Sequence, residues 1–115
     1  MPVLDFDKSF DKQPGEELTI RLELANLFES LVVSGYALSA AEVKIFDSAG
    51  LDVSASMISG VPSIDAINNY VFVTMIDGTD AKDYFGRLKP TWTKAGQPDQ
   101  KPECDFLIRV RQKGF

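Results

Sequence analysis

Three aspartates at regular spacing are the first residues of this chain that could do chemistry. Asp77, Asp80 and Asp83 stand three residues apart in the segment IDGTDAKDYF. Carboxylate oxygens are the ligands that Ca²⁺ prefers, so the spacing defines a weak candidate for a calcium site. The segment lacks the alternate acids, the central glycine and the terminal glutamate of an EF-hand loop. Aspartates that hydrogen-bond their own backbone in a turn are the favoured alternative.

Catalytic chemistry has few candidates in this chain. It contains no histidine, which removes the usual general base near neutral pH and the commonest metal ligand. The single cysteine, Cys104, excludes an internal disulfide and has no histidine to activate it, so we expect a buried, inert thiol. The chain has no GxSxG motif and no glycine-rich phosphate loop with its lysine. We therefore predict no catalytic residue, no cofactor and no enzyme activity.

Two amphipathic aromatic residues, Tyr84 and Trp92, could bind a sugar by stacking. Both share a parity with Leu88 in an alternating segment, and that parity predicts the inward face of a strand. We therefore expect core packing, with the Tyr84 hydroxyl bonded back to the preceding turn. Asp80 and Tyr84 also stand four residues apart, as at the corner that opens a late strand of immunoglobulin-like sandwiches.

Basic residues gather on the opposite parity of the same segment and of the last strand, and these two segments should form a hairpin. The predicted partner-binding residues on this surface, called the hairpin face below, are Phe85, Arg87, Lys89, Leu107, Arg109 and Arg111. Like charges placed directly opposite one another destabilise a sheet, so acidic side chains should meet them. Glu17 or Glu23 of the same chain could supply the acids. The alternative is a docking surface for an acidic partner.

Alternating apolar and polar residues predict the strands that position these side chains. The expected strands cover residues 16–24, 32–47, 51–59, 70–76, 84–93 and 103–111. Residues 60–63 should form a loop, and helical spacing over residues 24–31 predicts a short helical turn that covers one end of the sheets. Pro90 lacks an N–H, so its strand needs a bulge or an unpaired position there.

Strand signals at roughly ten-residue spacing predict an all-β fold, an immunoglobulin-like β-sandwich of about seven antiparallel strands with a short helical turn. With 115 residues the chain has room for one domain. We assign residues 16–115 to it and residues 1–15 to an N-terminal arm or edge strand. The arm either covers a sheet edge or reaches a neighbouring subunit.

The bulk properties narrow the classes of partner. A net charge of −5 argues against nucleic acid as the main partner, because phosphate binding needs a basic surface. No apolar run approaches the roughly 20 residues of a membrane span, and no basic-then-apolar leader opens the chain. These features predict a soluble protein without a membrane or nucleic-acid partner.

Four segments resemble, in order, a group of small bacteriophage proteins. They are FDKQPGEELTIRLEL, SAAEVKIFDSAGLDVS, IDGTDAKDYFGRLKPTWTKAGQ and ECDFLIRVRQ. The resemblance covers residues 12–113, and its most specific part is the G-T-D-x-x-D-Y turn with the hairpin and final strand that follow. The family consists of immunoglobulin-like sandwiches encoded among tail and neck genes, often labelled fibre–tail adaptors. Residues 26–33 and 98–102 depart from its pattern.

The resemblance implies a non-catalytic structural or assembly module of a phage or prophage tail or neck. Such a module would be a virion component made in the cytoplasm of the bacterial host, and it would need no cofactor. Its expected partners are other phage structural proteins, with further copies of the same chain as an alternative. A receptor- or glycan-binding adhesion module is the alternative function.

Overall fold

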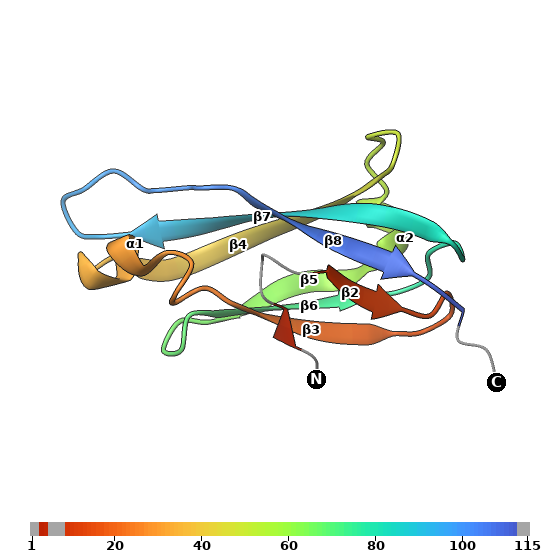
Figure 1. Ribbon diagram of the computed structural model, residues 1–115. Coiled ribbons are helices and arrows are strands. Elements are labelled where there is room, and N and C mark those ends of the chain that lie inside the picture. Colours follow the sequence, from red (N-terminus) through yellow and green to blue (C-terminus); the bar gives the residue numbers. More distant parts are fainter. Residues whose placement is uncertain (1–2, 5–8, 113–115) are drawn as a thin grey trace.

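A computed structural model describes residues 3–4 and 9–112, and these residues form two four-stranded sheets that pack face to face (Figure 1). The first sheet has the order β1 (Val3–Leu4), β3 (Leu18–Glu23), β6 (Tyr70–Met75) and β5 (Ile58–Asp65). The second sheet has the order β2 (Ser9–Lys12), β8 (Cys104–Val110), β7 (Lys82–Thr93) and β4 (Ala37–Asp47). This is the ABED sheet facing the GFC sheet of an immunoglobulin sandwich, with β2 added beside the last strand. The predicted all-β immunoglobulin-like sandwich is confirmed.

The predicted N-terminal arm contributes one strand to each sheet. β1 pairs with β3 and β2 pairs with β8, both in parallel, whereas antiparallel pairing had been expected throughout. Each arm strand lies at an edge, so it occupies backbone groups that would otherwise be open to other chains. Residues 1–2 and 5–8 of the arm lie outside the described residues. The alternative, an arm that reaches a neighbouring subunit, stays a prediction.

The core lies between the sheets and follows the predicted parities. Alternate side chains along most of β3, β6, β7 and β8 are buried. The core residues include Ile20, Leu22, Val43, Ile45, Val71, Val73, Met75, Leu88, Trp92, Ile108 and Val110. β6 lies between β3 and β5, and Tyr70, Phe72 and Thr74 on its outer face are half-buried. The central position predicted for this apolar strand is therefore confirmed.

The segment after β4 differs from the prediction. Residues 51–59 were expected to be a strand and residues 60–63 a loop, but Ser54–Met57 forms the short helix α2 and β5 runs through the expected loop. The Asp52 carboxylate accepts a hydrogen bond from the Ser54 N–H at 2.9 Å, and the Ser54 hydroxyl accepts one from the Ile45 N–H at 2.8 Å. These bonds start a helical turn. A register shift between Ser59 and Ser63 then lets β5 continue through Gly60.

Strand β4 contains a bulge that the sequence did not predict. The register with β7 shifts between Leu38 and Ala40, so the inward parity changes within the strand. Leu38 is consequently buried, whereas Ala37 and Ser39, which share a parity with the buried Val43 and Ile45, are exposed. One extra residue on a single strand is enough to reverse the direction of every side chain beyond it.

The predicted unpaired position at Pro90 is present. The paired stretch of β7 and β8 ends at Leu88 and Cys104, two residues before the proline. The Trp92 N–H points toward the same side, where it donates to the Gln100 carbonyl oxygen at 2.8 Å. Amide directions alternate along a strand, so the nitrogen of Pro90 faces the gap between these two pairings and loses no ladder hydrogen bond.

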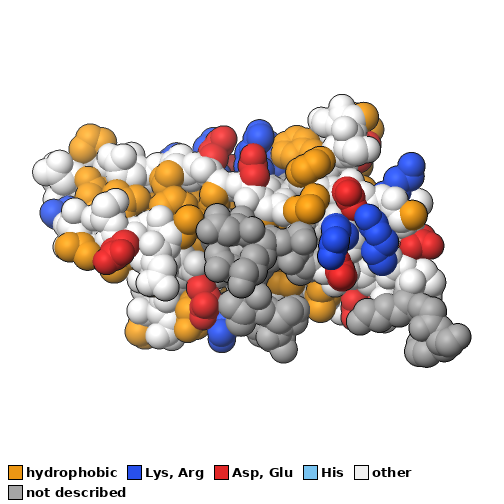
Figure 2. Space-filling view, in the orientation of Figure 1, with side chains coloured by type: hydrophobic (Ala, Val, Ile, Leu, Met, Phe, Trp, Pro, Cys, Tyr) orange, Lys and Arg blue, Asp and Glu red, His pale blue; other side chains and the backbone are white. Residues whose placement is uncertain are grey.

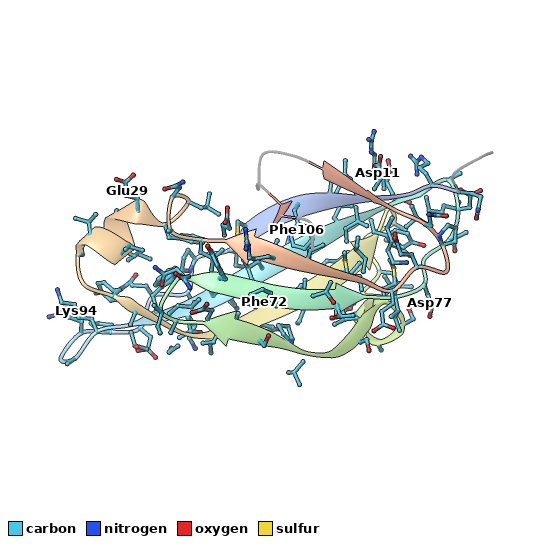
Figure 3. The ribbon with its side chains drawn as sticks, turned by 90° about the horizontal axis from the view of Figure 1, so that it is seen from below. Asp11, Glu29, Phe72, Asp77, Lys94 and Phe106 are labelled. Carbon is cyan, nitrogen blue, oxygen red and sulfur yellow. The ribbon has the colours of Figure 1, made fainter. Side chains whose placement is uncertain are left out.

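Helix α1 (Glu29–Val33) covers the end of the sandwich where the β7–β8 loop lies, as the helical spacing predicted. The Phe28 ring packs 5.8 Å from that of Trp92, and Leu31 and Val32 also pack against the core. Figure 3 shows Glu29 and Lys94 at this end and Asp77 at the opposite end. No helix in the described part of the chain is long and apolar enough to span a bilayer.

Gly86 shows why a glycine stands in the middle of the longest strand. It lies opposite Phe106 on β8, and a Cβ atom at Gly86 would come within 2.1–2.6 Å of three ring carbons of Phe106. The aromatic ring therefore occupies the space above the glycine, an arrangement that fills the gap left by the missing side chain.

We expect Gly86→Ala to lower the free energy of unfolding by about 1–3 kcal/mol or more, because the methyl group would overlap the Phe106 ring in a packed core. Urea denaturation followed by tryptophan fluorescence measures the change. Gly15→Ala is the matched control, since a Cβ there meets no atom within 4 Å. Equal stability of the two variants would contradict the arrangement.

Candidate functional site

The hairpin face exists as a continuous surface on the outer side of the second sheet. In the antiparallel register of β7 and β8, Phe85 lies opposite Leu107, and Arg87 lies opposite Asp105. Arg109 lies opposite Asp83 on one side and, through β2, opposite Asp11 on the other. The hairpin predicted from the two alternating segments therefore brings the predicted residues together.

Every basic side chain of the hairpin face forms an ion pair within the chain. The pairs are Arg87–Asp105 at 3.1 Å, Lys89–Glu103 at 3.5 Å, Arg109–Asp11 at 2.9 Å and Arg111–Asp83 at 2.8 Å. In Figure 2, Lys and Arg side chains lie beside Asp and Glu side chains along the upper and right-hand parts of the view. The hydrogen bond that Arg87 donates to the Asp105 carboxylate also raises the pKa of Arg87 above its usual value. The face is therefore close to neutral.

The acids that balance the face are different from those the sequence suggested. Glu17 or Glu23 was the candidate source within the chain, but Glu23 pairs with Arg21 at 3.1 Å. Glu23 belongs to β3, in the first sheet, so the whole core separates that strand from the outer side of the second sheet. The acids come instead from the second sheet itself and from the loop before β8. The expectation of an acidic partner loses its electrostatic basis.

An apolar row crosses the middle of this face. Phe46 on β4 lies opposite Phe85 on β7, which in turn lies opposite Leu107 on β8. Phe85 is 47% exposed, and Phe46 and Leu107 are half-buried. The Arg87 guanidinium carbon lies 5.4 Å from the centroid of the Phe46 ring. Sequence reasoning missed Phe46, although it shares the outward parity of the charged residues on its strand.

A shallow depression of about 320 Å³ adjoins the apolar row. The Phe46 and Phe85 side chains line it together with Arg87, Asp105 and residues of the turn after β4. It therefore lies between the aromatic residues and an ion pair, and it gives the outer face a hollow beside Phe85, the most exposed apolar side chain of the row.

The three aspartates proposed for calcium do not form a common site. The Asp83 carboxylate pairs with Arg111, and the Asp80 carboxylate accepts the Gln112 N–H at 2.8 Å. Asp77 contributes its backbone carbonyl oxygen to a lysine, as described below. Within the described part of the chain, no three acidic, cysteine or histidine side chains lie close enough together to hold a metal ion.

Tyr84 forms the corner that its spacing predicted. Its hydroxyl oxygen accepts a hydrogen bond from the Thr79 N–H at 3.1 Å, and the turn adopts positive φ at Asp77 and Gly78. Tyr84 and Trp92 are 7% and 0% exposed, so both are core residues and neither can stack on a sugar. The structural interpretation of this turn is therefore confirmed.

Lys12 is a buried cation that the sequence analysis missed. Its side chain is 1% exposed, and its ammonium group donates hydrogen bonds to the carbonyl oxygens of Gln13 at 2.8 Å, Pro14 at 3.4 Å and Asp77 at 2.6 Å. Burial lowers its pKa, and this effect exceeds the opposing attraction of Glu16 and Asp77. The lysine therefore connects two turns that lie far apart in the sequence.

Cys104 is half-buried at the inner side of β8. Its thiol lies 3.8 Å from the Leu88 carbonyl oxygen, the acceptor for its weak S–H donor. Burial, with a smaller contribution from the Asp105 carboxylate, raises its pKa to about 12. A thiol in this state carries almost no thiolate at neutral pH and is a poor nucleophile.

The chain was also compared with known proteins. No protein-family model matches it, and no curated protein sequence matches it significantly.

We expect Lys12→Met to lower the free energy of unfolding by about 1–3 kcal/mol, because the buried carbonyl oxygens lose their donor. Methionine has a similar length, so packing changes little. Urea denaturation gives the value, and Lys101→Met, at an exposed lysine of the β7–β8 loop, is the control. An unchanged or higher midpoint for Lys12→Met would mean that burial of the charge costs more than its hydrogen bonds contribute.

The Cys104 thiol should resist alkylation by iodoacetamide at pH 8 in the folded protein and react readily in denaturant. The reason is the pKa of about 12, which falls to the ordinary thiol range once the chain unfolds. Mass spectrometry of timed samples follows the reaction. Equal rates in the two states would contradict the buried position.

Proposed function

We propose that this protein is a non-catalytic structural module that binds another protein through the outer face of the second sheet. The observation that supports this most is the apolar row of Phe46, Phe85 and Leu107, flanked on both sides by ion-paired side chains. Protein interfaces commonly have such an arrangement, with an apolar centre and a polar surround that keeps water away from it.

The position of the row on a sheet favours binding. β7 has 12 residues and is paired along its length with β4 on one side and with β8 on the other for its first half. The inward-facing side chains of β7 and β8 pack into the core. Side chains held on such a surface lose little conformational freedom when a partner covers them, which reduces the entropic cost of association.

The resemblance to small phage tail and neck proteins supports a virion as the setting. On this proposal the chain is made in the cytoplasm of a bacterial host and joins a tail or neck, where its partners are other structural proteins. The motif that carries most of the resemblance is the turn that ends at Tyr84, and its role is structural. The resemblance therefore supports a virion as the setting. The outer face of the second sheet supports protein binding through its apolar row.

The alternative, a receptor- or glycan-binding adhesion module, loses the two aromatic residues that were its candidates for sugar stacking. Tyr84 and Trp92 are buried. The most exposed aromatic residue on the sheet face, Phe85, has no polar group that could hydrogen-bond to a sugar hydroxyl. We therefore prefer protein assembly to glycan recognition.

Sedimentation of phage particles tests the proposal. We expect an epitope-tagged copy of the chain to sediment with particles released by a bacterium that carries the gene, and to remain with them after a salt wash. Arg109→Glu should reduce its incorporation, because the variant places an acid between Asp11 and Asp83 and so lines up three acids on the outer face. Lys101→Glu, at an exposed site in the β7–β8 loop, makes the same change in net charge and serves as the control.

Recovery of the wild-type chain only in the supernatant would overturn the virion setting. Equal incorporation of the two charge variants would overturn the assignment of the docking surface to this face.

A further inference from the structure

We propose that the outer face of the second sheet binds a second copy of this chain, in a twofold-symmetric dimer centred on Phe85 and Leu107. This rests on the proposed function in one respect, since both assign protein binding to this face. It goes further by naming the partner.

The charges around the central pair alternate in sign. On β7 the sequence of outward side chains is Asp83, Phe85, Arg87, and on β8 it is Asp105, Leu107, Arg109. The antiparallel register places Asp83 opposite Arg109 and Arg87 opposite Asp105. Two acids and two bases therefore stand at the corners of a rectangle around the apolar pair, each next to charges of the opposite sign.

This rectangle of charges is electrostatically complementary to a second copy of itself. When two such faces meet in a symmetric dimer, the twofold axis lies in the plane between them. An axis that runs across the strands places Arg87 over the partner's Asp83 and Arg109 over the partner's Asp105. An axis that runs along the strands places Arg87 over the partner's Asp105 and Asp83 over the partner's Arg109. Either axis brings unlike charges together.

A face of a single sign would behave in the opposite way. Four bases without acids beside them would meet four bases of the second copy and repel it. The ion pairs with Asp11, Asp83, Glu103 and Asp105 remove that obstacle. The whole chain carries a charge of −5, so two copies can approach closely only where the surface is locally balanced.

The apolar row supplies the attraction. Phe85 is 47% exposed in the single chain, and under either axis it would lie against the central pair of the second copy. Phe46 extends the row by one strand. Two sheets that pack face to face bury such side chains between them, as the two sheets within this domain already do. The four charged side chains and their ion-pair partners Asp11 and Arg111, at 43–61% side-chain exposure, would then surround the buried centre.

Sedimentation velocity of the purified full chain, from low micromolar to near-millimolar concentration, tests the dimer. We expect a concentration-dependent equilibrium between monomer and dimer. Phe85→Ser should weaken it by at least about 30-fold, the loss expected of a central interface residue. Ile67→Ser removes a 92% exposed apolar side chain from the turn between β5 and β6 and should leave the dimer unchanged. Tryptophan fluorescence confirms that each variant is folded.

Mixing experiments with charge variants test the role of the four charges around Phe85 and Leu107. Arg87→Asp alone should weaken the dimer, because it places like charges opposite one another under both axes. An equimolar mixture of Arg87→Asp with Asp83→Arg restores unlike pairs if the axis runs across the strands. A mixture with Asp105→Arg restores them if the axis runs along the strands. Recovery of a heterodimer in one mixture supports the proposal and identifies the axis.

Three results would overturn the dimer: a wild-type chain that stays monomeric at all concentrations, a Phe85→Ser variant that dimerises like the wild type, or failure of both mixtures to restore association. A monomeric chain that nevertheless sediments with phage particles would leave the proposed function intact and assign the face to a different virion protein. A dimer that never enters particles would support the dimer and overturn the virion setting.

Discussion

The ammonium group of Lys12 links two of the three crossings that the chain makes between the sheets at one end of the sandwich. One crossing leads from β2 to β3 through Gln13 and Pro14, and the other leads from β6 to β7 through Asp77 (Figure 1). Lys12 donates hydrogen bonds to carbonyl oxygens of both crossings, and the Tyr84 hydroxyl accepts an N–H of the second. With one cysteine, the chain has no disulfide between its sheets. Packing in the core and the hydrogen bonds of Lys12 and Tyr84 hold the two sheets together instead.

The corner has consequences for the outer face. The Arg111 N–H donates to the Lys12 carbonyl oxygen at 2.8 Å, which places the end of β8 beside the end of β2. That pairing brings Asp11 to Arg109. The backbone at Lys12 thereby helps to set the charge of the surface a few residues away. The balanced face follows from strand pairing and needs no partner to supply its acids.

Charge balance also changes what the face can bind. A basic patch selects acidic partners by long-range attraction, whereas a neutral face with exposed aromatic residues relies on shape and apolar contact. Exposed ion pairs contribute about 0–1 kcal/mol each to the stability of the fold, so their greater effect is on which surfaces can approach. The alternation of signs around Phe85 and Leu107 fits this view, since it favours a matching pattern and penalises a uniform one.

The sequence by itself determined the sandwich, the inward parities of β3, β7 and β8, and the corner at Tyr84. These features depend on the alternation of apolar and polar residues along one strand and on the spacing of residues within one turn. Both can be read from a single short segment of the sequence. Only the tertiary structure decided which acids meet Arg87 and Arg109, that Lys12 is buried, that Phe46 joins Phe85 in one row, and where bulges change the parity of β4 and the course of β5. Each of these depends on the register between strands that are distant in the sequence. A shift of one residue in that register would have given a different neighbour to every charge on the face.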